Sequence, residues 1–163
     1  MSVDLAVIGG TGLYRLAALQ DEQALEGDTI YGRPSAPVRV GKLGGKTLAF
    51  LARHGEGHSV PPHLVNYRAN LRRLADLGVR RVLIADDILD EGHTLKAVRD
   101  WCEDQGAVEV KIAVLCVKKH DRRVEGIDAD YIALEVPDSY VYGYGMDYHE
   151  QGRNLPGIYA LVR

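Results

Sequence analysis

Apolar segments separated by polar turns define the predicted elements of this chain. Residues 4–8, 81–85 and 108–117 have central runs that are apolar on both faces, which is typical of buried parallel strands. Residues 38–43 and 46–51 flank Gly44-Gly45, which predicts a β-hairpin with a tight two-residue turn. The remainder, from residue 127 onward, alternates short strand-like runs with glycine turns.

A second pattern repeats apolar positions every three or four residues. It predicts helices over residues 63–77 and 93–104 and a weaker helix over residues 13–25. The strand, helix and strand over residues 81–117 form a βαβ unit, which is right-handed by rule. We therefore predict one α/β domain over residues 1–163, with three layers, a mostly parallel central sheet and the hairpin as an insertion. Residues 82–85 are expected between residues 5–8 and 112–115 in one continuous sheet.

Composition limits the class of protein without assigning a function. The chain has 163 residues, 46% hydrophobic and 26% charged, which fits one soluble globular domain. A net charge of −3 gives no electrostatic reason to expect nucleic acid or an anionic membrane as a partner. We expect no signal peptide or membrane span. Cys102 and Cys116 fall on a predicted helix and strand, which favours core thiols of a reduced, cytoplasmic protein.

The segment from Asp86 to Leu95 carries most of the chemical information. Asp86, Asp87 and Asp90 are placed between a buried strand and a helix, where open α/β sheets bind their ligands. The backbone N–H groups of the helix start, with Gly92 and Thr94, can hold a phosphate. The two leading acids would then accept from sugar hydroxyls or meet Mg²⁺. The alternative is an ordinary helix with an acidic first turn, which explains one or two acids.

A second candidate for phosphate binding is located earlier in the chain. The turn of residues 9–12 follows a strand, and its N–H groups together with Thr11 could cradle an anion. Arg53 and His54 end another strand and could hold the same anion. A plain strand-to-helix turn, a surface arginine and a hydrogen-bonded loop histidine explain the same residues. His58 and His63 are spaced too irregularly to predict a zinc site.

Residues 84–95 resemble the phosphoribosyl-pyrophosphate loop of bacterial hypoxanthine-guanine phosphoribosyltransferases. The likeness continues through residues 114–120, 137–148 and 153–156, and it covers roughly residues 80–163. It implies a phosphoribosyltransferase-like, Rossmann-like version of the predicted fold. Purine and phosphoribosyl pyrophosphate or a nucleotide would be the partners and Mg²⁺ the cofactor, while assembly into a homo-oligomer is left open.

The resemblance also implies a role for each matching residue. Asp90 would be the catalytic acid that handles the proton on the purine ring nitrogen. Asp86 and Asp87 would hold the ribose hydroxyls, and Asp86 and Asp147 would face the metal. The remaining substrate-binding residues would be Glu91, Gly92, His93 and Thr94 at the phosphate, Lys118 at the 6-oxo group, Tyr140 and Val141 at the purine, and Arg153 at pyrophosphate.

Simpler explanations stay open for several of these residues. One of Lys118 and Lys119 is expected to be merely solvated, and the alternating tyrosines around Tyr140 could form one face of an ordinary strand. Arg153 lies close to the C-terminus, where an exposed arginine is usually just solvated.

The first half of the chain resembles a different family. Residues 7–14, 31–37, 50–55 and 61–70 are similar to methylthioadenosine and methylthioinosine phosphorylases of the purine nucleoside phosphorylase superfamily. That likeness covers residues 3–84 and implies that Thr11, Arg53 and His54 bind phosphate. It predicts a chimera with a phosphorylase-like half over residues 1–83 and a phosphoribosyltransferase-like half over residues 84–163.

Three functions stay open at this point. A 6-oxopurine phosphoribosyltransferase is favoured because the second half carries the residues for base, ribose and phosphate. The chain has no counterpart of that family's pyrophosphate loop or closing loop, so we expect weak turnover. The alternatives are a non-catalytic, natural or engineered chimeric domain that binds purine nucleotides or phosphate, and a methylthio-nucleoside phosphorylase.

Overall fold

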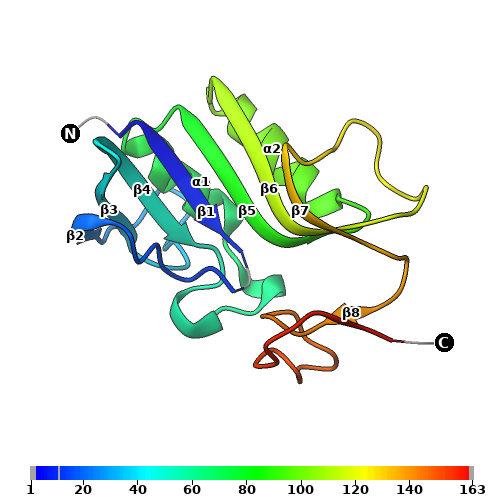
Figure 1. Cartoon of the computed structure of the whole chain (residues 1–163). Coiled ribbons are helices and arrows are strands. Elements are labelled where there is room, and N and C mark those ends of the chain that lie inside the picture. Colours follow the sequence, from blue (N-terminus) through cyan, green and yellow to red (C-terminus); the bar gives the residue numbers. More distant parts are fainter. Residues whose placement is uncertain (1–2, 11, 162–163) are drawn as a thin grey trace.

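The computed structural model describes residues 3–10 and 12–161, and its centre is a seven-stranded sheet with the order β2-β3-β4-β1-β5-β6-β7 (Figure 1). The strands from β4 to β7 are parallel, while β2 and β3 extend the sheet with antiparallel pairing. The strands are β1 (Leu5–Gly9), β2 (Gln20–Leu25), β3 (Val38–Leu43), β4 (Lys46–Ala52), β5 (Arg81–Leu89), β6 (Glu109–Lys118) and β7 (Tyr131–Val136). The α/β class and the mostly parallel sheet are therefore confirmed.

The strand shared by the two halves lies at the centre of this sheet. β5 pairs with β1 on one side, Ile8 opposite Ile84, and with β6 on the other, Ile84 opposite Ile112. The prediction that residues 82–85 lie between residues 5–8 and 112–115 is confirmed. Both halves consequently contribute to one large hydrophobic core cluster.

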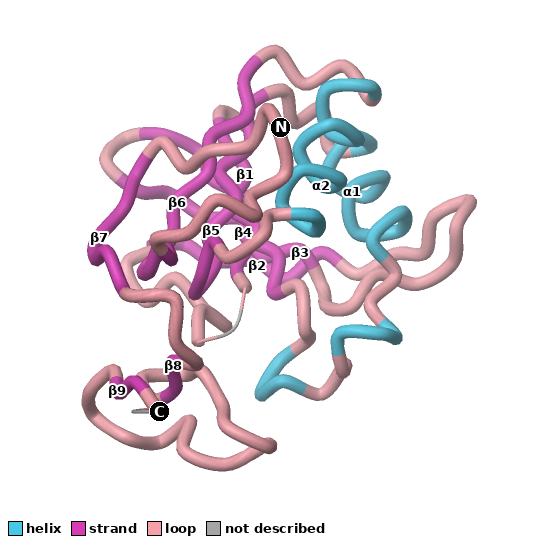
Figure 2. Tube along the Cα trace, turned by 90° about the vertical axis from the view of Figure 1, so that its right-hand side faces the viewer, coloured by secondary structure: helices cyan, strands magenta, loops and turns pink. Residues whose placement is uncertain are grey.

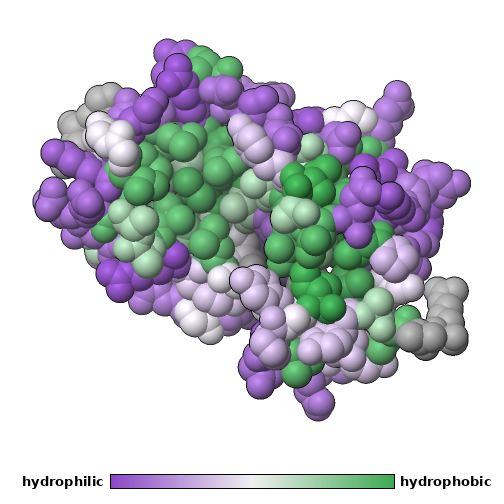
Figure 3. Space-filling model, viewed as in Figure 1, coloured by the Kyte–Doolittle hydropathy of each residue, from purple (hydrophilic) through white to green (hydrophobic). Residues whose placement is uncertain are grey.

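Both α-helices cover the same face of the sheet (Figures 1 and 2). They are α1 (Tyr67–Asp76) and α2 (His93–Asp104). Their buried residues Leu71, Leu74, Leu95, Val98 and Cys102 pack in the main core, as the periodicity predicted. On the opposite face, the third layer is formed by Leu13, Leu16 and Leu19 of a loop that packs against Val7 and Phe50. Figure 3 views this face, where apolar residues gather over the strands.

The predicted helix over residues 13–25 is wrong. Residues 20–25 form β2, an edge strand that pairs antiparallel with β3 and leaves most of its side chains exposed. The segment has few apolar side chains to bury, so its backbone is satisfied by pairing with β3.

The predicted helix over residues 63–77 is shorter than expected. Pro61 and Pro62 precede a short 3₁₀ turn, η2 (Pro62–Leu64), and α1 begins only after Asn66. The Asn66 side chain accepts a hydrogen bond of 3.1 Å from Ala69 N and caps the helix. A similar 3₁₀ turn, η1 (Glu56–His58), follows β4.

The C-terminal segment forms a small unit beside the large sheet. β8 (Val141–Tyr142) pairs antiparallel with β9 (Tyr159–Ala160), separately from the seven strands. Val141 is buried against Cys116 and Met146, which attaches this unit to β6. Within the described residues, no helix combines the length and apolar character needed to cross a membrane.

Candidate functional site

The candidate site is a cleft of about 430 Å³ at the C-terminal ends of β4 and β5. It brings residues of both halves of the chain together, as expected from the shared sheet. Its lining includes Arg53, His54, Asp86, Asp87, Asp90, Glu91, Gly92, His93 and Thr94, all of which were predicted from the sequence, together with Pro62, Tyr67, Ile88 and Leu95.

The two leading acids belong to a strand and not to the turn after it. β5 continues to Leu89 because β6 is long enough to pair with it, with Asp86 opposite Val114 and Ile88 opposite Cys116. The expectation that the strand ends at Ala85 is therefore wrong by four residues.

The glycine turn after β1 approaches Asp86 closely. The Gly10 backbone N donates a hydrogen bond of 2.7 Å to the carbonyl oxygen of Ala85. A Cβ atom at Gly10 would lie 2.3 Å from Asp86 Oδ1, so only glycine fits here. The glycine turn after β1 and the acids of β5 are thus adjacent, while Thr11 lies outside the described residues.

A buried ion pair joins the two halves inside the cleft. The Arg53 guanidinium donates two hydrogen bonds of 2.9 Å to Asp86, one to each carboxylate oxygen. The two side chains are only 9% and 8% exposed. Burial lowers the pKa of Arg53, but the charge of Asp86 outweighs it and the pKa is raised overall. Both terminal nitrogens of the Arg53 guanidinium are therefore already engaged by Asp86 and are not free to bind a phosphate.

His54 connects this ion pair to the loop that contains Val60. Its Nδ1 lies 3.1 Å from the Val60 carbonyl oxygen and must donate to it, because a carbonyl cannot donate. Nε2 is then free to accept the 3.2 Å hydrogen bond from Arg53 Nε. Burial and the neighbouring Arg53 charge lower the pKa of His54, so the ring is neutral. The ring also stacks on His58 with centroids 4.6 Å apart.

Asp87 is a buried acid next to an ionised one. Burial, followed by the negative charge of Asp86, raises the pKa of Asp87 to about 7. Its backbone N–H donates a hydrogen bond of 3.0 Å to Asp86 Oδ1. Three donors from the chain itself therefore engage Asp86, and the raised pKa of Asp87 favours its neutral form.

Asp90 lies at the other end of the cleft, between two basic side chains. Lys118 Nζ is 2.5 Å from Asp90 Oδ2, and His120 Nε2 is 2.7 Å from Asp90 Oδ1. Burial works to raise the pKa of Asp90, but hydrogen bonds from Lys118 and His120 outweigh it and the pKa is lowered. Lys118 thus reaches the catalytic candidate, whereas Lys119 is exposed and pairs with Glu135 on the sheet edge.

The start of α2 is open toward the cleft. Gly92 precedes the helix with a φ of 86°, and no side chain caps the first turn. A Cβ at Gly92 would also lie 2.7 Å from Ile127 Cγ2, so packing as well as ligand access requires glycine. His93 and Thr94 are exposed, and Glu91 pairs with His93 at 3.4 Å. The Glu91 side chain is therefore held by a neighbour of its own loop.

The remaining predicted residues lie in the C-terminal segment and do not line this cleft. Arg153 pairs with Asp147 Oδ1 at 2.7 Å and donates a hydrogen bond of 2.9 Å to the Gly145 carbonyl. Tyr140 is half exposed, its hydroxyl donates to the Asp147 carbonyl, and the side chain of Val141 is buried in the core. Gly145 in turn approaches the glycine turn at Gly12.

The predicted Mg²⁺ ligands do not form a prepared metal site. Asp86 is engaged by Arg53, and Asp147 by Arg153 and the backbone N–H of Glu150. Among residues 3–10 and 12–161, no group of three or more His, Cys, Asp or Glu residues is arranged to hold a metal ion. Mg²⁺ stays a prediction, and no chemical step is derived through it.

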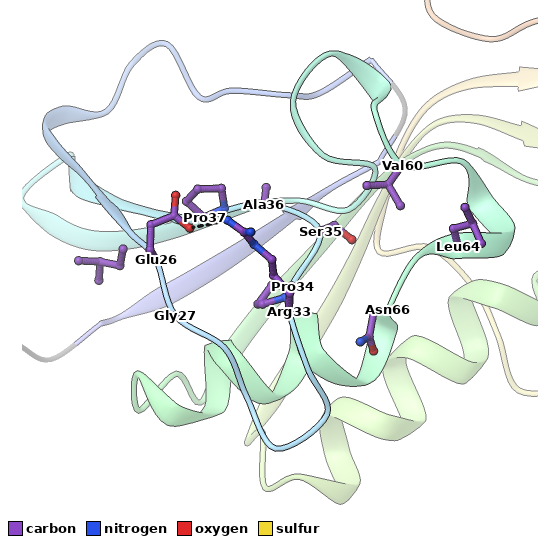
Figure 4. A pocket seen from close by; sticks show the side chains of 11 residues that line it. Glu26, Gly27, Arg33, Pro34, Ser35, Ala36, Pro37, Val60, Leu64 and Asn66 are labelled. Atoms are coloured by element: carbon purple, nitrogen blue, oxygen red, sulfur yellow. Dashed lines mark ion pairs between the residues drawn. The ribbon is translucent and has the colours of Figure 1, made fainter.

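A second cavity, of about 360 Å³, lies in the first half of the chain (Figure 4). Ser35, Pro37 and Val60 line it, together with Arg33 and Glu26, which form an ion pair at 3.7 Å. None of the predicted site residues lines this cavity, so it is separate from the cleft.

Sequence reasoning missed two contacts of the cleft. The Arg53–Asp86 pair was missed because both residues had been assigned to ligands. His120 was missed as a partner of Asp90, although it follows Lys118 by two residues, the spacing that puts side chains on one face of an extended chain.

Comparisons with known proteins recover relatives of two kinds. The chain is 60% identical over 87 residues to a probable S-methyl-5'-thioinosine phosphorylase of Xanthomonas campestris pv. campestris, an alignment covering 53% of this chain and 35% of that protein. The chain therefore spans about a third of the length of this relative.

Two solved structures represent the same two kinds of relative. An adenosine/methylthioadenosine phosphorylase variant from Schistosoma mansoni, in complex with adenine, is 36% identical with a TM-score of 0.50, covering 53% of this chain and 30% of its own. A hypoxanthine-guanine phosphoribosyltransferase from Bacillus anthracis is 34% identical with a TM-score of 0.47, covering 51% and 48%.

The match to a protein-family model covers a longer part of this chain than the relatives described above. The model of the phosphoribosyl transferase domain matches residues 39–149, which include the hairpin, β5, the cleft acids, Lys118 and the tyrosine-rich segment. This match extends over more than half of the sequence and across the junction between the halves. The chain therefore belongs to the phosphoribosyl transferase domain family.

Proposed function

We propose that the protein transfers a phosphoribosyl group from phosphoribosyl pyrophosphate to a 6-oxopurine. The observation that carries this proposal is the pairing of Lys118 with Asp90 at 2.5 Å, beside the uncapped start of α2. One region therefore contains three groups: Lys118 as a donor for an exocyclic oxygen, Asp90 as an ionised acid, and the start of α2 as an anion site. Residues of these types at these places are what base recognition, proton removal and phosphate binding require.

In the proposed reaction, a purine ring nitrogen forms a bond to the anomeric carbon of the ribose. The bond from that carbon to the pyrophosphate oxygen breaks, and pyrophosphate leaves with the bonding electrons. The proton released from the purine ring passes to Asp90, which is ionised because its pKa is lowered. The N–H groups of Gly92, His93 and Thr94 would hold the 5-phosphate, and Lys118 would donate to the 6-oxo group.

We further propose that the chain is a chimera in which a phosphorylase-like segment supplies β1 to β4 and α1. The coverage of 53% by the phosphorylase relative supports this origin. Only the phosphate end of a phosphorylase site, Arg53 and His54, would be present, and Arg53 is engaged by Asp86. Phosphorolysis of a methylthio-nucleoside is therefore the weakest of the three candidate functions.

The Arg53–Asp86 ion pair favours a second candidate, nucleotide binding without turnover. Asp86 is proposed to accept from a ribose hydroxyl, and a bidentate arginine occupies both of its oxygens. A ribose hydroxyl must displace that arginine, share an Asp86 oxygen with it, or be held by Asp87 alone. Loss of one positioning contact would reduce the rate more than it reduces binding.

The test is nucleotide formation from hypoxanthine, phosphoribosyl pyrophosphate and Mg²⁺, followed by absorbance. We expect activity that falls by about 10²- to 10⁴-fold in Asp90→Asn, because the amide cannot accept the proton. Asp100→Asn, an acid on the outer surface of α2 paired with Lys96, is the matched control and should keep full activity. Inosine monophosphate binding without any turnover in the unaltered protein would reject the enzyme and favour the binding module.

Base choice gives an independent test of Lys118. We expect inosine and guanosine monophosphates to bind about ten- to a hundredfold more tightly than adenosine monophosphate, since an amino group cannot accept from a buried ammonium. Lys118→Ala should abolish this preference, while Lys119→Ala, whose side chain is 65% exposed, should keep it. Calorimetry that finds equal affinities, or a preference that survives in Lys118→Ala, would contradict the assignment.

A further inference from the structure

His120 is a buried imidazole with a defined hydrogen-bond partner on each ring nitrogen. Its side chain is 2% exposed. The backbone N–H of Arg122 donates a 3.1 Å hydrogen bond to Nδ1, so Nδ1 is an acceptor and carries no proton in this arrangement. The ring proton is therefore on Nε2, which lies 2.7 Å from Asp90 Oδ1. The loop backbone thus fixes both the tautomer and the direction of the donor.

Lys118 holds the other oxygen of the same carboxylate in a different way. Its ammonium is on a flexible stem, and the proposed function gives it a second acceptor on the purine. An imidazole that is buried and held on both nitrogens has no such freedom. Of the two partners of Asp90, His120 is thus the one held in place. It therefore fixes the position of Asp90 Oδ1.

We propose that His120 is the positioning residue of Asp90, holding Oδ1 through Nε2–H so that Oδ2 faces the purine ring nitrogen when Lys118 turns to the base. This inference rests on the proposed function. The proton taken from the purine goes to Asp90 Oδ2, and His120 neither gains nor loses a proton. His120 is therefore not a catalytic residue itself.

A test of His120 requires that the charged residues around it keep their charges. Asp90 and Lys118 adjoin it, and Arg122 with its bidentate partner Asp138 lies on the outer side of the loop. The hydrogen bonds that Arg122 donates to Asp138 lower the pKa of Asp138 to about 2, so this acid stays ionised over the useful pH range. Asp87, whose pKa is raised to about 7, does titrate near neutral pH, so its carboxyl carbon signal is followed separately from that of Asp90.

The experiment compares His120→Gln, His120→Phe and the unaltered protein. Glutamine can still donate to Oδ1, whereas phenylalanine keeps a ring and loses both hydrogen bonds. We measure the pKa of Asp90 by carboxyl carbon NMR, and kcat and KM for hypoxanthine and phosphoribosyl pyrophosphate as a function of pH. In His120→Phe the pKa of Asp90 should rise, because a donor to the ionised form is lost. The acidic limb of the kcat profile should move up with it.

The magnitudes separate positioning from a general structural effect. In His120→Phe, kcat should fall by about 10²-fold while KM for phosphoribosyl pyrophosphate stays within a few-fold, since misplacement of the reacting group affects the chemical step. His120→Gln should restore most of kcat. If the phenylalanine variant does not fold, His120→Asn replaces it, because its shorter amide cannot reach Oδ1.

Unchanged Asp90 titration and unchanged kcat in the variants that lose the donor would overturn the inference. Its failure is distinguishable from failure of the proposed function. If the unaltered protein forms no nucleotide, the transfer reaction is rejected, and the NMR titration of Asp90 in the same variants still decides whether His120 holds the carboxylate.

Discussion

Replacing Arg53 by methionine is expected to lower the free energy of unfolding by about 3–5 kcal/mol at neutral pH, because it leaves a buried carboxylate without its partner. Arg53 and Asp86 are less than a tenth exposed, and the pair makes two hydrogen bonds of 2.9 Å. Among the residues that the structure describes, Asp86 would keep only the backbone N–H of Asp87 as a donor. Urea unfolding at constant pH and ionic strength measures the loss.

A surface pair of the same geometry is the matched control for this prediction. Arg122 and Asp138 also form a bidentate pair, at 2.7 and 2.8 Å, but their side chains are 49% and 39% exposed. Arg122→Met should therefore have a much smaller effect, since solvent screens the remaining charge. The double variant Arg53→Met/Asp86→Leu should recover most of the stability, because an apolar pair can replace a buried ion pair. Equal losses in Arg53→Met and Arg122→Met would refute the prediction.

The fold was largely predictable from runs that are apolar on both faces. β1, β5 and β6 have such runs, and a strand of that kind has few places other than the interior of a parallel sheet. The helix α2 was found with its bounds because Leu95, Val98 and Cys102 repeat at helical spacing and Gly106 follows its end. β2 was not found, since Gln20 to Leu25 carries little apolar pattern and depends on the edge of β3 for its conformation.

The candidate site was predictable as a set of residues but not as a set of contacts. The position of the acids after a buried strand indicated a ligand site, and the cleft contains them. Local sequence cannot reveal that Arg53, just after β4, meets Asp86 on β5, because the contact depends on β1 lying between the two strands. The same holds for His120, whose partner Asp90 is thirty residues away in the chain.

Asp87 is expected to make the protein less stable as the pH rises from about 4 to about 7. Burial and the charge of Asp86 raise its pKa to about 7 in the folded state, against about 3.9 in the unfolded chain. In that interval the folded state binds more protons than the unfolded state, so stability falls with increasing pH and levels off above the folded pKa. Three pKa units correspond to a loss of roughly 4 kcal/mol as an upper value.

Asp87→Asn isolates this contribution, because an amide of the same shape has no proton to lose. The variant and the unaltered protein should have similar free energies of unfolding near pH 4. The variant should become the more stable of the two by several kcal/mol at pH 8, because the unaltered protein then holds two adjacent buried carboxylates with one arginine. Taking the difference between the two proteins cancels the titration of other groups. Unfolding curves whose difference does not change between pH 4 and pH 8 would show that the pKa of Asp87 is not raised in the folded state, and would contradict the prediction.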